Sequence, residues 1–110
     1  MATVYVTQVP NRKVGDSYVP SVNISPAAEH GILITMMPPQ ASFHATQDLV
    51  RQMTEALKAY DYEAGDSILA LGDPTIMGVA FAILGKLKGK FRVLKWDRNI
   101  KRYTISSVIL

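Results

Sequence analysis

The chain of 110 residues contains no cysteine. This absence excludes a disulfide scaffold, a thiol nucleophile, a zinc finger and an iron–sulfur site. Histidine is scarce as well, since only His30 and His44 are present, and no acidic cluster has the spacing of metal ligands. We therefore expect neither a metal site nor a cofactor.

Long apolar runs are missing too. The longest strongly apolar window, residues 76–84, is about half as long as a membrane span requires. The N-terminus lacks a basic stretch followed by an apolar one, so no signal peptide is indicated. These features predict a soluble intracellular protein with no membrane partner.

The residues that are present suit one packed domain over 1–110, with 48% hydrophobic and 19% charged residues. The net charge of +3 conceals an asymmetry. Residues 86–110 contain eight basic residues and one acidic residue, Asp97, for a net charge of +7, whereas residues 1–85 carry −4. The chain is electrically polarised, with a basic C-terminal quarter.

Apolar runs of the length and alternation typical of strands predict strands over 3–9, 32–37, 67–71, 91–96 and 103–110. The uninterrupted, β-branched run 32–37 is typical of a strand buried on both faces. Residues 11–26 are polar and contain glycine and proline, which predicts a long loop, with a short edge strand as an alternative. Its apolar residues are expected to pin it to the body: Val14, Tyr18, Val19, Val22 and Ile24.

Two helices are predicted from apolar residues at helical spacing. The first spans about 46–60 with Thr46 as its cap, and the second about 75–86 with Asp73 as N-cap and Pro74 at the first position. The second helix is apolar nearly all round, so it requires cover on more than one side. With only one other helix available, this favours a homodimer.

The order of these elements predicts the fold class. Successive β-α-β units with right-handed crossovers imply a parallel core. We expect an α/β domain with a small mixed sheet: a parallel β-α-β-α-β core, Rossmann-like with two helices, and an antiparallel C-terminal hairpin.

Ligands of such sheets bind beyond the carboxyl ends of the strands, where helices begin. If the strands 32–37 and 67–71 are neighbours, both helix N-termini face one crevice suited to a phosphate or carboxylate. Asp73 is more simply explained as a cap, and the phosphate-loop, dinucleotide and G-x-S-x-G patterns are absent, so no catalytic residue is assigned. The candidate crevice comprises Gln40, Ser42, His44, Gly72, Asp73 and Thr75.

The basic C-terminal hairpin is the second candidate site. Basic side chains attract phosphates and aromatic rings stack on unpaired bases, although a charged edge hairpin with a core tryptophan explains the same pattern. A basic face also suits an acidic protein partner. The candidate residues are Arg92, Lys95, Trp96, Arg98, Lys101, Arg102 and Tyr103.

Most of the chain resembles a family of short proteins encoded by tailed bacteriophages, and a strand–GDP–helix–strand–WDR order is the most specific part of this resemblance. It implies a phage gene expressed in a bacterial host and assigns no catalytic residue. The stretches that carry it are 69–78 (LALGDPTIMG), 80–83 (AFAI), 91–98 (FRVLKWDR), 102–103 (RY), 4–8 (VYVTQ) and 25–31 (SPAAEHG).

Together these observations favour a non-enzymatic phage accessory protein in the host cytoplasm that binds a host or phage macromolecule, foremost a protein. Two alternatives stay open. One is an anionic-ligand-binding, nucleotide-binding or enzymatic domain that uses the crevice, and the other is nucleic-acid binding by the hairpin.

Overall fold

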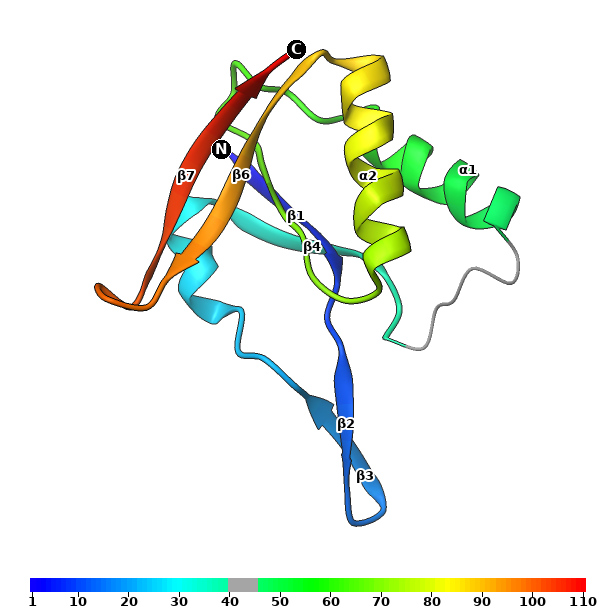
Figure 1. Ribbon diagram of the computed structural model, residues 1–110, viewed down its shortest axis with the longest axis vertical. Coiled ribbons are helices and arrows are strands. Elements are labelled where there is room, and N and C mark those ends of the chain that lie inside the picture. Colours follow the sequence, from blue (N-terminus) through cyan, green and yellow to red (C-terminus); the bar gives the residue numbers. More distant parts are fainter. Residues whose placement is uncertain (40–45) are drawn as a thin grey trace.

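A computed structural model describes residues 1–39 and 46–110 of the chain. Its main feature is a five-stranded sheet in the order β4-β1-β5-β6-β7, in which β1 pairs in parallel with β4 and β5, β5 pairs in parallel with β6, and β7 runs antiparallel to β6 (Figure 1). The mixed sheet with its antiparallel C-terminal hairpin confirms the predicted α/β fold class. The strands are β1 (Thr3–Gln8), β4 (Ile32–Met37), β5 (Ser67–Leu69), β6 (Lys90–Asp97) and β7 (Arg102–Ile109).

The two faces of the sheet are covered differently. Helices α1 (Thr46–Leu57) and α2 (Pro74–Leu87) pack on one face, over a core cluster that includes Tyr5, Ile68 and Phe91. The short 3-10 helix η1 (Ser25–His30) lies against the other face, whose smaller cluster contains Val4, Val6, Ala27, Leu69, Leu94 and Tyr103. Alternation along the strands therefore divides the core into two layers.

Helix α2 begins as the sequence predicts. Asp73 accepts a hydrogen bond from Thr75 N–H at 2.7 Å, and Pro74 occupies the first turn, where its missing N–H costs nothing. The helix contacts α1 on one side and β1 and β6 on another, which is the cover that its apolar sequence requires. Gly78 and Ala82 are among its exposed residues, so part of its outer surface is formed by small side chains.

The predicted loop over 11–26 contains a hairpin that projects from the body (Figure 1). Strands β2 (Asn11–Val14) and β3 (Ser17–Pro20) pair with each other in a separate two-stranded sheet, joined by a turn at Gly15. The expectation that its apolar residues pin it to the body is wrong for Val14, Tyr18 and Val22, which are 40–68% exposed. Ile24 alone of the five packs against a core cluster, since the hairpin is too far from the sheet to bury the others.

Strand β4 corrects a second expectation. The apolar run 32–37 is not buried on both faces, because β4 stands at the edge of the sheet and pairs with β1 alone. Ile32 and Ile34 are 53% and 45% exposed. Strands β4 and β5 are also not neighbours, since β1 lies between them, so the condition for one crevice shared by both helix N-termini is not met.

Candidate functional site

The structure describes only part of the predicted crevice. Gln40, Ser42 and His44 lie outside the described residues, whereas Gly72, Asp73 and Thr75 lie together at the start of α2. From β1 the chain passes to β4 on one side of β1, and it later reaches β5 on the other side of β1. The carboxyl ends of β1 and β5 thus flank the point at which doubly wound sheets bind their ligands.

Gln8, a residue that the sequence analysis did not single out, lies at this point. Its amide oxygen accepts a hydrogen bond from Asp73 N–H at 2.9 Å, and its amide nitrogen donates to the carbonyl groups of Pro38 and Pro39 at 2.9 and 3.2 Å. The side chain therefore joins the end of β1 to the segments that follow β4 and β5. The signal in the sequence is a polar residue at the end of an apolar strand, where it is 3% exposed.

These contacts occupy backbone N–H groups that a bound anion would need as hydrogen-bond donors. The N–H groups of Asp73 and Thr75 are bonded within the chain, and Pro74 has none. Gly72 has φ +89°, and a Cβ there would lie 2.3 Å from the Gln8 amide oxygen. The described part of the crevice is thus filled by protein, and the anion-binding alternative stays a prediction without supporting geometry there.

The C-terminal hairpin divides the predicted basic residues into two groups. Arg92 lies near the opposite end of β6 from Trp96, with its guanidinium 3.8 Å from the centre of the Tyr62 ring, and it donates to the Tyr62 carbonyl group. Lys90, on the same strand, pairs with Glu63 at 2.5 Å. These two cations are engaged within the chain.

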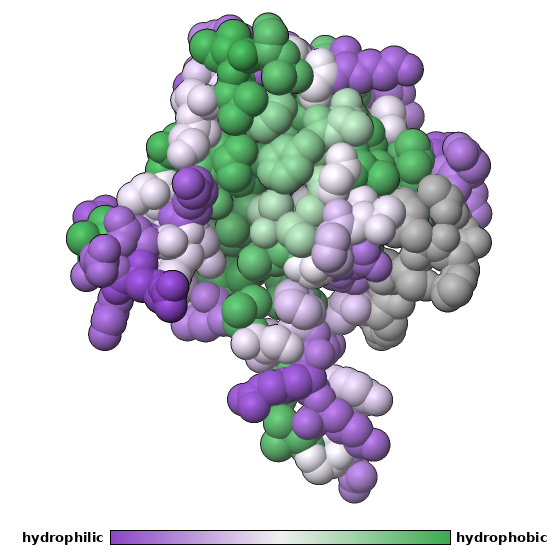
Figure 2. All heavy atoms as spheres, viewed as in Figure 1, coloured by the Kyte–Doolittle hydropathy of each residue, from purple (hydrophilic) through white to green (hydrophobic). Residues whose placement is uncertain are grey.

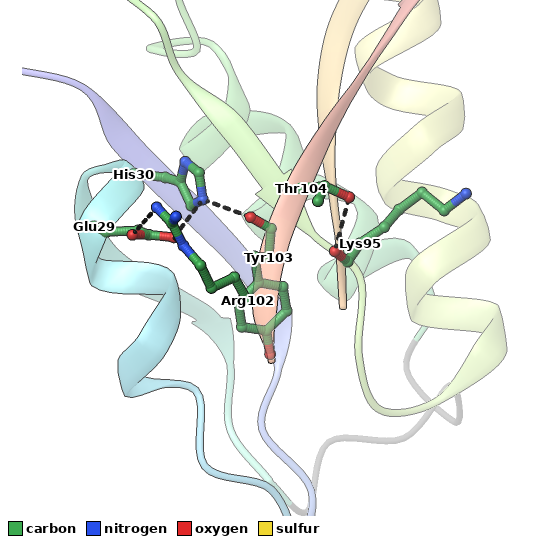
Figure 3. Close-up of polar contacts among 6 residues, drawn as sticks. All are labelled: Glu29, His30, Lys95, Arg102, Tyr103 and Thr104. Atoms are coloured by element: carbon green, nitrogen blue, oxygen red, sulfur yellow. Dashed lines mark hydrogen bonds and ion pairs between the residues drawn. The ribbon is translucent and has the colours of Figure 1, made fainter. Parts of the chain in front are cut away.

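Arg102 is engaged as well (Figure 3). Its guanidinium donates two hydrogen bonds to Glu29, at 2.8 and 3.2 Å, and His30 Nε2 donates to the Tyr103 carbonyl group at 3.0 Å. The hydrogen bonds from Arg102 lower the pKa of Glu29 below its usual range. The pair attaches η1 to the start of β7, next to the buried Tyr103.

The other three cations surround the turn between β6 and β7. Lys95, Arg98 and Lys101 are exposed, and none forms an ion pair within the described parts of the chain. In Figure 3 the Lys95 side chain points away from the Glu29–Arg102 pair. Figure 2 shows hydrophilic atoms gathered at this turn, on the left of the view. Lys101 has φ +53°, in the left-handed region that glycine and asparagine favour, so the turn keeps a lysine at a conformational cost.

Trp96 lies beside these cations and is 46% exposed, with its ring 5.0 Å from the Tyr103 ring in an edge-to-face contact. The interpretation of this tryptophan as a core residue is therefore wrong for nearly half of its surface. It separates two hollows. The first, which we call the Trp96 hollow, has a volume of about 410 Å³ and is lined by Val22, Asn23, Leu69, Ala70, Leu71, Leu94, Lys95, Trp96 and Tyr103.

The second, the turn hollow, has a volume of about 590 Å³ and is lined by Lys95, Trp96, Asp97, Arg98, Asn99 and Thr104. A third, the Val22 hollow, has about 710 Å³ and no charged lining residue; it is bounded by Val9, Asn11, Pro20, Ser21, Val22, Asn23, Ile24, Ser25, Leu33, Thr35 and Pro39. Shared residues connect the three: Val22 and Asn23 join the third to the first, and Lys95 and Trp96 join the first to the second. The Val22 and Trp96 hollows form one path across the sheet face that carries η1, from β4 to Trp96. Lys95 and Thr104 alternate with Leu94 and Tyr103 of that face, so the turn hollow opens on the other side of the hairpin and meets the path at Trp96.

The described residues contain no group of three or more histidine, aspartate or glutamate side chains that could hold a metal ion. In the same residues, no helix is both long and apolar enough to cross a bilayer. What the region offers is an apolar path that ends in unpaired positive charge.

The fold and the site together define a small α/β protein with a doubly wound strand order, and its sequence contains no nucleotide-binding fingerprint. The chain belongs to the family described as Phage Pam3 gp32-like protein, whose family model matches residues 2–109. The predicted resemblance to phage proteins is thereby confirmed. No curated protein and no solved structure matches the chain significantly.

Proposed function

We propose that this phage protein is a non-enzymatic binding module whose partner is a protein segment lying across the carboxyl end of the sheet. The observation that carries the proposal is the path of two connected hollows that ends at the half-exposed Trp96, with the turn hollow on the far side of that residue. Such a path can hold an extended segment of a partner, and it needs no reactive group.

The lining of the path defines the chemistry of that segment. The Val22 hollow is uncharged, and the Trp96 hollow has leucine side chains from β5 and β6 on its floor. The turn hollow, by contrast, is bordered by two cations, Lys95 and Arg98, and one acidic residue, Asp97. A matching segment has apolar side chains over the first two hollows and acidic side chains at the turn.

Energetics favour Trp96 as the anchor. Tryptophan is enriched among the residues that contribute most to binding, because a large ring buries much apolar area at a small entropic cost. The three unpaired cations supply long-range attraction for an acidic partner and raise the association rate more than the affinity. Removal of Trp96 is therefore expected to weaken binding more than removal of one cation.

The test is affinity capture from nuclease-treated lysate of phage-infected host cells, with the wild-type chain, Trp96→Ala, Lys101→Asn and Lys86→Gln. Lys86 is an exposed cation on α2, away from the path, so its variant controls for the loss of one charge. We expect one protein to be retained in stoichiometric amount by the wild type and by Lys86→Gln. Trp96→Ala should reduce its retention by about tenfold or more, corresponding to at least ~1.4 kcal/mol. Equal retention by Trp96→Ala, or no retained protein, would contradict the proposal.

A second candidate function is nucleic-acid binding at the turn. The observation that favours it is an exposed indole next to a turn whose cations Arg98 and Lys101 form no ion pair within the described residues. Aromatic stacking and phosphate attraction are the two contributions that single-stranded nucleic acid requires. The check is titration of Trp96 fluorescence with oligo(dT) at low and high salt. Quenching that weakens steeply with salt, and is lost in Lys95→Gln/Arg98→Gln/Lys101→Asn, supports it; no change at low salt excludes it.

A further inference from the structure

Strand β4 is an edge strand whose own residues lack the usual protection. Its sequence, ILITMM, contains no charged residue, and β1 is the strand with which it pairs. Natural edge strands carry lysine, proline or a bulge that prevents pairing with another chain. An exposed, uncharged and β-branched edge is therefore a surface that favours the addition of a further strand.

The exposed side chains of β4 reinforce this property. Ile32 and Ile34 are two residues apart and lie on one face of the sheet. Tyr5 pairs in register with Ile34 and belongs to the cluster beneath the helices, so this is the face that carries α1 and α2. The two isoleucines are 53% and 45% exposed, which leaves an apolar surface directly at the unpaired edge.

The distribution of charge indicates what pairs with this edge. The basic quarter of the chain forms β6 and β7, at the opposite end of the sheet from β4. Two copies that met through β7 would bring two segments of net charge +7 together. Two copies that met through β4 would keep those segments at the far ends, and their contact strands would carry no like charges.

We infer that a second copy of this chain pairs with β4, antiparallel strand against strand, to form a continuous ten-stranded sheet in a twofold-symmetric dimer. A twofold axis perpendicular to the sheet keeps the helices of both copies on one face, so the four isoleucines at positions 32 and 34 cluster there. The binding path begins at Leu33 and Thr35 of the same strand, but on the sheet face that carries η1, whereas Ile32 and Ile34 lie on the opposite face. The inferred dimer also differs from the dimer that the apolar α2 suggests.

The first test is the mass of the full chain by sedimentation velocity across a wide range of concentration. We expect a concentration-dependent dimer for the wild type. Ile34→Lys should raise the dimer dissociation constant by about tenfold or more, since it places two like charges near the axis. Ile109→Lys is the matched control, because Ile109 is an exposed isoleucine on the opposite edge strand. A wild type that stays monomeric, or a dimer that Ile109→Lys weakens as much as Ile34→Lys does, would overturn the inference.

The absence of cysteine allows a second measurement that does not depend on how Ile34→Lys folds. Single cysteines are introduced in turn at Leu33, Ile34 and Thr35, with Ser107→Cys on β7 as the control. Directly opposed residues of antiparallel strands lie about 4.5–5.5 Å apart, within reach of a disulfide. Rapid oxidation to a covalent dimer at one or more β4 positions, and slow oxidation at position 107, supports the inference. Equal rates at all four positions contradict it.

Discussion

The amide oxygen of Gln8, in the last residue of β1, lies 2.9 Å from the backbone nitrogen of Asp73, in the residue that caps α2. One side chain thus connects β1 to the start of the helix that follows the neighbouring strand, β5. The adjacent Thr7 does the same for β5, because its hydroxyl donates to the Leu71 carbonyl group at 2.6 Å and accepts from Leu71 N–H at 2.7 Å. The carboxyl end of the sheet is closed by hydrogen bonds between buried polar groups of the chain itself.

The approach of Gln8 requires glycine at position 72. Gly72→Ala forces a Cβ within 2.3 Å of the amide oxygen and holds alanine at φ +89°, so we expect a loss of about 1–3 kcal/mol in the free energy of unfolding. Denaturant unfolding measures it. Gly15→Ala is the control, since Gly15 also has a positive φ, +62°, but no atom lies within 4 Å of its Cβ position. A loss in Gly72→Ala no larger than in Gly15→Ala would show that the contact with Gln8 contributes nothing.

Tyr60 predicts a dependence of stability on alkaline pH. Its hydroxyl donates to the Asp66 carbonyl group at 2.8 Å and accepts from Arg92 N–H at 2.9 Å, and the residue is 2% exposed. Burial raises the pKa of Tyr60 above its ordinary value. The folded state therefore favours the neutral phenol. The resulting stability is complete below the ordinary tyrosine pKa, about 10, and is lost as the pH rises through the higher folded value.

Urea unfolding of Tyr60→Phe between pH 8 and pH 11 tests this expectation. At pH 8 the variant loses the two hydrogen bonds, at a cost of about 1–3 kcal/mol, because buried partners are left unsatisfied. Its stability should then decline less steeply above pH 10 than that of the wild type. Some decline persists, since burial also raises the pKa of Tyr5 and Tyr103. Tyr18→Phe, in the exposed hairpin, should leave the stability at pH 8 unchanged. Parallel curves for Tyr60→Phe and wild type would refute the role of Tyr60.

Local signals in the sequence are sufficient to predict much of the fold. Asp73 and Pro74 specify the start of α2 by cap chemistry, and the alternation of 91–96 with 103–110 specifies the hairpin. The run 32–37 could not be placed, because a central strand and an unprotected edge strand have the same composition. The order of strands is set by contacts between distant segments, and the pairing of β4 with β1 alone is such a contact.

The candidate site was predictable to a similar degree. A count of charges identifies the basic quarter, but it cannot show which cations stay unpaired. Arg102 is bound by Glu29, which lies 73 residues earlier, and Arg92 packs on Tyr62, 30 residues earlier. These long-range contacts remove two cations from the predicted surface. The positive charge that remains unpaired on the hairpin lies at its turn, beside Trp96.

The Glu29–Arg102 pair predicts a titration at acid pH. Hydrogen bonds from Arg102 hold the pKa of Glu29 below its usual range, so the attachment of η1 to β7 is complete above the ordinary glutamate pKa, about 4.3. It is lost as the pH falls through the lower folded value. NMR titration of the Glu29 carboxyl group is expected to show a pKa below that ordinary value in the wild type and a return toward it in Arg102→Gln. Arg98→Gln removes an equal charge from the turn and should not move it; an equal shift in both variants would indicate a general effect of charge.

Lys101 offers a way to change the charge of the turn without unfolding it. Its φ of +53° costs a lysine free energy, whereas asparagine is enriched in this region of the backbone map. Lys101→Asn should therefore raise the free energy of unfolding by up to ~1 kcal/mol, because it removes part of this strain. Lys95→Asn removes the same charge from a strand, where asparagine is disfavoured, and should lower stability slightly. Thermal and denaturant unfolding of both variants checks the difference in sign. If Lys101→Asn is the less stable of the two, its side chain stabilises the turn, and any effect of this substitution on partner binding would then have to be attributed to folding.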